Sequence, residues 1–190
     1  MILTDDEIWL NGTQNCDISD FRIDPFNPNQ VEPASYDFRL ASTILRFTPY
    51  GYAQAFKTVD PLNLPDQLTF PFEIDGYFDL MPGEFLLGSS VERFTFGPSI
   101  CGVCMGKSSL ARVGLIIENA GLFDPGFEGT ATLEIVNIAR HAIRLTPGML
   151  IGQMMFYRTT QTVGRPYGSV AGRNRYQGQD GPTEARRIPE

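Results

Sequence analysis

Histidine is almost absent from this sequence, and cysteine is scarce. The chain has one histidine, His141, and three cysteines, Cys16, Cys101 and Cys104. Because no serine or cysteine motif lies near His141, the sequence argues against catalysis by a Ser–His or Cys–His pair. Three cysteines cannot form an even disulfide framework, so we expect a reduced, intracellular protein.

Long apolar runs and an excess of positive charge are also lacking. No window approaches the roughly 18 apolar residues of a membrane span, and the first ten residues lack the basic and apolar regions of a secretory signal. The formal net charge is −7, whereas binding to a nucleic-acid polymer normally needs a basic face. We therefore expect a cytoplasmic protein that binds neither a membrane nor a nucleic-acid polymer. A small polyanion in a locally basic pocket is compatible with this charge.

The spacing of Cys101 and Cys104 matches a CxxC motif, which has two interpretations. A zinc site would need further ligands, and Cys16 and His141 occur in no ligand-like spacing. The segment also alternates as a strand does, which sends positions 101 and 104 to opposite faces. The sequence therefore favours structural cysteines over zinc. It also lacks the phosphate-binding GxxxxGK[ST] and a GxGxxG in a βαβ setting.

The distribution of turn residues predicts an all-β fold. The 19 glycines and 14 prolines are scattered along the chain, and they separate short runs that alternate polar and apolar residues. The expected strands cover residues 35–40, 85–87, 90–95, 100–105 and 150–157. We expect residues 35–40 to be half-buried, residues 49–69 to form a loop, and residues 3–10 to form a helix capped by Thr4. This pattern is typical of a sandwich or jelly-roll-like barrel with one or two short helices.

The character of the sequence changes near residue 164. The following segment is polar, rich in glycine and arginine, and poor in core-forming residues. Composition alone indicates a disordered tail. The interleaving of Tyr167, Arg175 and Gln179 also suits a segment that closes over a ligand. We therefore divide the chain into a β domain, residues 1–163, and a C-terminal lid segment, residues 164–190.

Four side chains that are able to bind phosphate follow an expected strand. Lys107, Ser108 and Ser109 precede Arg112, so two hydroxyls and two cations lie within six positions. Such a cluster can form a phosphate cradle. It can equally be a helical turn capped by serine with solvated cations, and the residues alone leave both interpretations open.

Two carboxylates complete the candidate site. Asp124 precedes a Pro-Gly turn, where aspartate is commonly a turn residue. Glu134 lies inside an expected strand, between Leu133 and Ile135 on one face and beside Thr132 on the other. A glutamate in this position needs a solvent face or a function. In a pocket its pKa would rise toward the range useful to a general base.

Successive motifs of residues 106–156 resemble the superfamily of trimeric dUTPases and dCTP deaminases. The matching segments are GKSSLARVGL, AGLFDPGFEG, TLEIVN and TPGMLIGQ. The similarity extends to QVEPASYDFRL, MPGEFLLGS and PYGSVAGRNRYQGQDGPT, which resemble dCTP deaminases, and particularly the bifunctional, dUMP-forming kind. The resemblance covers most of the chain and is weak across residues 41–75.

The resemblance implies a distorted jelly roll of the dUTPase-like, β-clip type. It further implies a homotrimer with active sites between subunits, and a dCTP or dUTP nucleotide bound with Mg²⁺ through its triphosphate. No protein side chain would ligate this metal, and deamination would need no zinc.

The resemblance also implies roles for individual residues. Glu134 would activate water for attack on C4 of cytosine, and Ser108 and Arg112 would order that water, the glutamate and the nucleotide. Asp124 would activate water against the α-phosphate. The implied substrate-binding residues are Lys107, Ser109, Asn119, Ala120, Gln153, Tyr167, Arg175 and Gln179.

Two positions depart from the family's pattern. Many relatives carry a His-x-Thr-Ala run, which helps distinguish cytosine from uracil, where this chain has Ile117–Ala120 and is one residue shorter. Arg175 stands where monofunctional deaminases often have lysine, which keeps the charge but changes the geometry.

The function implied first is bifunctional: dCTP + 2 H₂O gives dUMP, ammonia and diphosphate. Ala120-Gly121 before Leu-Phe-Asp resembles the bifunctional pattern. The alternatives are a monofunctional dCTP deaminase that releases dUTP, a dUTPase, and a non-enzymatic regulator that responds to nucleotide.

Overall fold

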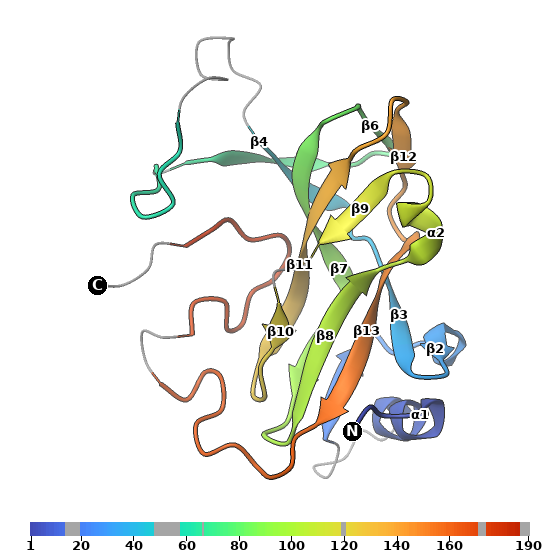
Figure 1. The fold of residues 1–190 in the computed structure, drawn as a ribbon, viewed down its shortest axis with the longest axis vertical. Helices are drawn as coiled ribbons and strands as arrows, with labels where there is room; N and C mark the ends of the chain where they lie inside the picture. Colours follow the sequence, from blue (N-terminus) through green and yellow to red (C-terminus); the bar gives the residue numbers. More distant parts are fainter. Residues whose placement is uncertain (14–19, 48–57, 66, 119–120, 171–173, 187–190) are drawn as a thin grey trace.

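The computed structural model of the chain describes residues 1–13, 20–47, 58–65, 67–118, 121–170 and 174–186. Two antiparallel sheets form most of this part, with a small third sheet at one end (Figure 1). The helices are α1 (Asp5–Thr13), α2 (Ser108–Ala111) and the short 3₁₀ helix η1 (Pro28–Gln30). The expected all-β fold with short helices is confirmed.

The first sheet has the strand order β5 (Thr69–Glu73), β4 (Thr43–Phe47), β7 (Phe85–Phe96), β11 (Glu128–Asn137) and β9 (Leu115–Glu118), and β1 (Phe21–Asp24) also pairs with β7. The second has the order β10 (Leu122–Phe123), β8 (Ile100–Gly106), β13 (Leu150–Arg158), β3 (Ser35–Arg39) and β2 (Val31–Glu32). The third pairs β12 (Ile143–Leu145) with β6 (Phe78–Leu80). Neighbours in the order are often far apart in sequence, so the register depends on long-range pairing.

Two sequence expectations about strands are corrected. Residues 85–87 and 90–95 form one strand, β7, because Gly88 continues it and leaves the space that the Ile135 side chain fills. Strand β3 is buried on both faces rather than half-buried. Its polar residue Asp37 is only 2% exposed because Lys107 covers it with an ion pair.

Aromatic side chains fill the space between the two large sheets. The rings of Phe21 and Phe156 stack with their centroids 4.1 Å apart, and the ring of Phe96 packs near Phe156 from the opposite sheet. Gly152 lies against the ring of Phe38, where a Cβ atom would come within 2.2 Å of that ring. Any larger residue at position 152 would therefore displace the core.

A carboxylate lies in the same interior. Glu92 of β7 has no solvent exposure. It accepts hydrogen bonds from the Arg39 backbone N at 2.8 Å, the Arg39 Nε at 2.7 Å and the Gln30 Nε2 at 3.0 Å. These donors belong to β3 and η1, so Glu92 connects the first sheet to the second. A buried charge without such partners would be strongly destabilising.

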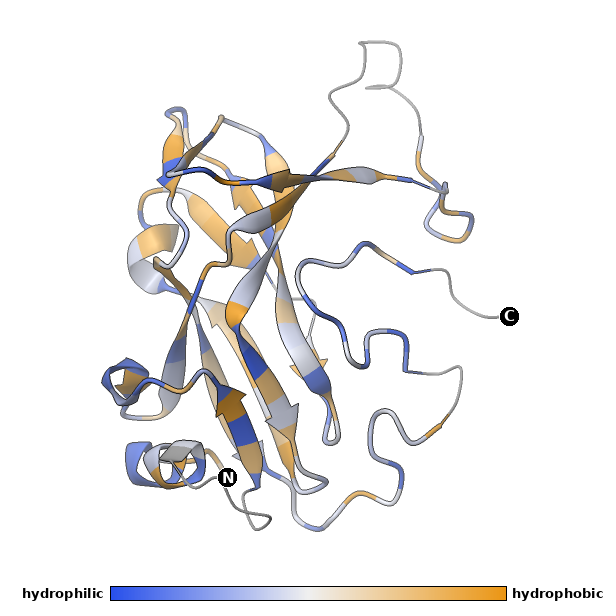
Figure 2. Cartoon of the chain, turned by 180° about the vertical axis from the view of Figure 1, so that it is seen from behind, coloured by the Kyte–Doolittle hydropathy of each residue, from blue (hydrophilic) through white to orange (hydrophobic). Residues whose placement is uncertain are grey.

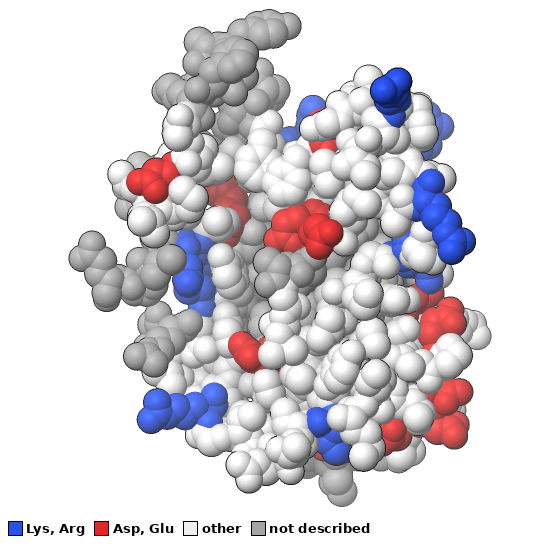
Figure 3. Space-filling model, in the orientation of Figure 1, with Lys and Arg blue, Asp and Glu red and all other residues white. Residues whose placement is uncertain are grey.

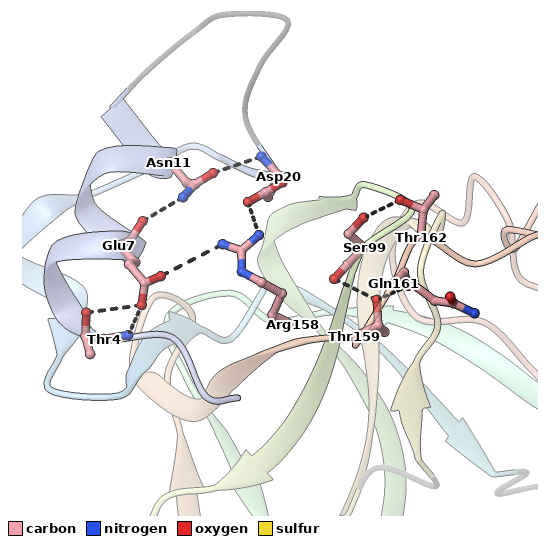
Figure 4. Close-up of polar contacts among 9 residues, drawn as sticks. All are labelled: Thr4, Glu7, Asn11, Asp20, Ser99, Arg158, Thr159, Gln161 and Thr162. Atoms are coloured by element: carbon pink, nitrogen blue, oxygen red, sulfur yellow. Dashed lines mark hydrogen bonds and ion pairs between the residues drawn. The ribbon is translucent and has the colours of Figure 1, made fainter.

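Helix α1 is attached to the end of β13 by polar contacts (Figure 4). It begins directly after Thr4, as expected, and the Thr4 backbone N donates to the Glu7 carboxylate at 3.0 Å. Arg158 donates to Asp20 at 2.6 Å and lies 3.8 Å from Glu7. Asn11 joins the same group by accepting from the Asp20 backbone N. Among the described residues, no helix is both long and apolar enough to cross a membrane.

We predict that Glu92→Ala lowers the free energy of unfolding by about 3–5 kcal/mol, because it leaves Arg39 and Gln30 without their buried acceptor. Urea unfolding at one fixed protein concentration measures this change. The control is Asp79→Asn, which breaks the exposed ion pair with Arg144 and should shift the unfolding midpoint only slightly. Equal shifts for both variants would contradict the connecting role of Glu92.

Candidate active site

A cavity of about 540 Å³ lies on the outer face of the first sheet. Its floor comes from β7 and β11, and one side comes from residues 121–127. The remaining walls come from residues 59–65 and 67–69 and from the described C-terminal part of the chain, and these two regions approach each other beside the sheet (Figure 1). Its lining is mainly apolar, and the polar residues that line it are Thr69, Asp124, Thr132, Glu134, Tyr167, Tyr176, Gln179, Thr183 and Glu184.

Strand alternation directs Glu134 into this cavity. Leu133 and Ile135 are fully buried in the core, whereas Thr132 and Glu134 line the cavity. Across the sheet, Glu134 pairs with Leu87 of β7 and with Glu118 of β9. The carboxylate therefore has an apolar neighbour on one side and an acidic one on the other.

This environment favours the protonated form of Glu134. Burial raises the pKa of its carboxyl above the ordinary value, and the charge of Glu118 adds to the rise. Its Oε2 atom is buried and has no hydrogen-bond partner among the described residues. A carboxyl with a raised pKa and an unused oxygen has the properties of a general acid or base.

Asp124 combines a turn role with a place in the cavity. Its carbonyl accepts a hydrogen bond from Phe127 N at 3.0 Å, which closes the Pro-Gly turn, and Gly126 supplies the required φ of +94°. Its side chain lines the cavity. The two interpretations of Asp124 therefore do not exclude each other.

The cluster near Lys107 lies elsewhere. Ser108, Ser109 and Arg112 are exposed and do not line the cavity. Helix α2 is a single turn whose N-cap is Lys107, without a side-chain cap. The expectation of a serine cap with a solvated lysine is therefore wrong, because the Lys107 ammonium pairs with buried Asp37.

Gln153 lies beside this ion pair. On β13 its direct cross-strand partner is Asp37 of β3, so both side chains project from the same face of the second sheet. Lys107 reaches that face from the end of β8. Amide, carboxylate and ammonium groups are thus gathered outside the cavity.

The C-terminal segment brings two of its expected residues to the cavity. Tyr167 packs against Phe127 with ring centroids 5.8 Å apart. Gln179 is buried, and its Nε2 donates to the Thr130 carbonyl at 2.6 Å. Arg175 does not line the cavity and donates to the Arg186 carbonyl at 3.1 Å.

The structure thus divides the expected site residues into two groups. Asp124, Glu134, Tyr167 and Gln179 line the cavity, whereas Lys107, Ser108, Ser109, Arg112, Gln153 and Arg175 do not. Asn119 and Ala120 lie outside the described residues. Helix α2 and the C-terminal segment lie on opposite sides of β11 (Figure 1). On the face shown in Figure 3, Lys and Arg side chains lie mainly toward the periphery, and acidic side chains lie both near the centre and along the edges.

Sequence reasoning missed the cavity residues Leu87 and Glu184 and also Glu118, which pairs with Glu134 across the sheet. Leu87 continues the apolar alternation of β7 and carried no functional signal. Glu118 was noted only as a departure from a motif, and its pairing with Glu134 depends on strand register. Glu184 lies in a segment of low complexity, where nothing in the sequence distinguishes it from a solvated glutamate.

Cys104 and His141 are placed as the sequence predicts, whereas Cys101 is only partly buried. Cys104 is buried, which raises the pKa of its thiol to about 12, and Cys101 faces the other side of β8. His141 is exposed, and Cys16 lies outside the described residues. Within the described ranges, no three His, Cys, Asp or Glu side chains form a cluster that could hold a metal ion.

Comparison with known proteins identifies the family. Residues 2–159 match the model of the family described as dCTP deaminase-like, and the chain belongs to this family. It is 44% identical over 167 residues to a dCTP deaminase, dUMP-forming, of Beutenbergia cavernae, covering 86% of this chain and 85% of that protein. The corresponding protein of Mycobacterium leprae is 44% identical over 169 residues, covering 87% of each chain.

A solved structure supports the fold assignment. The crystal structure of 2′-deoxycytidine 5′-triphosphate deaminase from Agrobacterium tumefaciens superposes with a TM-score of 0.61 at 19% identity. The match covers 82% of this chain and 46% of that chain, so this chain spans less than half of its length. The predicted dUTPase-like fold is confirmed.

We predict that Glu134→Gln stabilises the protein at pH 7 but not at pH 4. The pKa of Glu134 is raised on folding, so ionisation costs folding free energy once the pH exceeds the unfolded pKa of about 4.3. Below that pH both states are protonated and the cost disappears. Urea unfolding of both proteins at equal concentration tests this, and an equal gain at both pH values would contradict it.

Proposed function

We propose that this protein is a dUMP-forming dCTP deaminase, which converts dCTP and two waters to dUMP, ammonia and diphosphate. The observation that carries the proposal is Glu134, a cavity carboxyl with a raised pKa and an unpartnered oxygen. Relatives that are 44% identical over most of the chain are named for this activity.

Glu134 would handle the first water. Its carboxylate would remove a proton while the water oxygen attacks C4 of the cytosine ring. The same carboxyl would then deliver the proton to the exocyclic amine, which leaves as ammonia. A raised pKa suits this exchange because the group must both accept and donate a proton near neutral pH. Deamination would then need no zinc, and Cys101 and Cys104 on opposite faces of β8 suit a structural role.

Asp124 would handle the second water. It lines the same cavity on a hydrogen-bonded turn, where its exposed carboxylate could remove a proton from water attacking the α-phosphorus. The bond between that phosphorus and the diphosphate oxygen would break. The two carboxylates would therefore serve two different electrophiles.

The cavity of one chain lacks cations among its described lining residues, although a triphosphate carries several negative charges. We propose that the protein is a homotrimer in which a neighbouring subunit supplies the cations Lys107 and Arg112 to the cavity. The same subunit would contribute the polar side chains of Ser108, Ser109 and Gln153. On the outer face of the second sheet, Met105 lies beside Gln153 in the cross-strand register and is 47% exposed, so it offers an apolar contact next to this polar group.

Mg²⁺ would accompany the triphosphate rather than bind to a protein cage. Mg²⁺ is commonly held by one or two carboxylates together with substrate phosphates, and the described residues form no larger acidic cluster. The bound ion would neutralise phosphate charge. Tyr167, Gln179 and Arg175 would close on the nucleotide from the C-terminal segment, and Asn119 and Ala120 would contact the base.

We predict that the wild-type protein releases ammonia and dUMP from dCTP and Mg²⁺, and that Glu134→Gln lowers ammonia release by about 10²–10⁴-fold while nucleotide still binds. Chromatography of products and equilibrium binding measure both effects. Glu32→Gln, at an exposed position on β2, is the control. Release of dUTP without dUMP would indicate a monofunctional deaminase, consumption of dUTP alone a dUTPase, and binding without turnover a regulator.

We predict that Asp124→Asn lowers diphosphate release by about 10²-fold or more and lowers ammonia release much less, because the two waters are activated separately. Parallel assays of ammonia and diphosphate from dCTP measure the difference. Asp75→Asn changes another exposed aspartate in a turn and should leave both rates unchanged. Equal losses of both products in Asp124→Asn would contradict separate activation.

A further inference from the structure

Within the C-terminal segment, residues 174–186 follow an edge of β11, to which backbone hydrogen bonds attach them. Gly178 N donates to the Glu128 carbonyl at 2.8 Å, and Thr130 N donates to the Gln179 carbonyl at 3.1 Å. Gly129 and Gln179 form a parallel bridge. The segment is mostly hydrophilic (Figure 2), and these backbone hydrogen bonds hold it together with Tyr176, which packs against the hydrophobic core.

Beyond this pairing, Thr183, Glu184 and Ala185 line the cavity. Thr183 N donates to the Thr132 Oγ1 at 3.2 Å. The next residue, Glu184, accepts from the Thr69 backbone N at 2.7 Å and also from the Thr69 hydroxyl. Thr69 is buried and begins β5. One carboxylate therefore accepts two charge-assisted hydrogen bonds from the opposite side of the cavity.

These contacts join two walls that the chain supplies from distant regions. One wall includes Val59, Pro61, Leu64, Leu68 and Thr69. The other includes Tyr167, Tyr176, Gln179, Thr183, Glu184 and Ala185. Glu184 and Thr69 both line the cavity, and they are 115 positions apart in sequence. The Glu184–Thr69 contact thus connects the walls directly.

We propose that Glu184 is a positioning residue that fastens these two walls and retains the reaction intermediate between the two hydrolytic steps. The proposal rests on the proposed function, which requires two waters to react in sequence with one bound nucleotide. After the first step the nucleotide is dUTP if deamination comes first, or dCMP if hydrolysis comes first. An open wall would let either intermediate leave before the second step.

The test compares Glu184→Ala with Asp180→Asn. Asp180 is an exposed carboxylate four residues earlier in the same segment, so its variant removes the same charge without touching Thr69. With dCTP and Mg²⁺, Glu184→Ala should raise the ratio of free intermediate to dUMP by about tenfold or more, the effect expected for loss of a charge-assisted hydrogen bond. Its initial rate of ammonia release should stay within a few fold of wild type. Asp180→Asn should release dUMP alone.

Variants of the partner residue give an independent readout. Thr69→Val removes the hydroxyl but keeps the backbone N–H, so it should release less intermediate than Glu184→Ala. Thr69→Ser keeps both donors and should behave as wild type. Amide hydrogen exchange at Thr183 and Gly178 should be faster in Glu184→Ala than in Asp180→Asn, whether or not the protein turns over dCTP.

Several results would overturn the proposal. One is that Glu184→Ala releases dUMP as its only nucleotide product. Another is that Asp180→Asn releases as much free intermediate as Glu184→Ala. A third is that a normally folded Glu184→Ala protein no longer releases ammonia. A wild-type protein that releases no ammonia from dCTP would instead contradict the proposed function. In that case unchanged hydrogen exchange in Glu184→Ala would separately exclude the fastening role.

Discussion

The architecture depends on a charge that has no access to water. Glu92 lies in phase with Phe94 and Phe96 along β7, so the strand's alternation directs its carboxylate into the aromatic core. Arg39 and Gln30 donate hydrogen bonds to this carboxylate, which offset the cost of burying its charge. Because those donors come from the second sheet and from η1, satisfying one buried charge also sets how the two sheets face each other. The cavity floor belongs to the same β7, so its geometry follows from this connection.

The carboxylate of Glu134 in the cavity has an environment opposite to that of Glu92. Glu92 is fully satisfied, whereas Glu134 is left with a buried, unpartnered oxygen and an acidic cross-strand neighbour. The first arrangement stabilises the fold, and the second raises the pKa of a carboxyl at a cost in stability. Such local costs are typical of sites where chemistry takes precedence over packing.

Much of the fold could be predicted from local patterns, because alternation and turn residues are local properties. The same reasoning placed Glu134 opposite the core face of its strand and Asp124 at a turn. It failed for β3, where Asp37 stands between Tyr36 and Phe38 and is buried by a lysine 70 positions away. Contacts set by strand register and by a distant segment, such as Glu118 with Glu134 or Glu184 with Thr69, leave no signal in a short window.

The pairing between the C-terminal segment and β11 also affects the tendency of the protein to self-associate. Near Glu128–Thr130, one side of β11 pairs with β7, and the other side would present free N–H and C=O groups. Residues 178–179 occupy these groups, as a short added strand would, and thereby block a template for pairing between molecules. A chain shortened before residue 174 would expose that sheet edge and become prone to self-association, independently of any effect on catalysis.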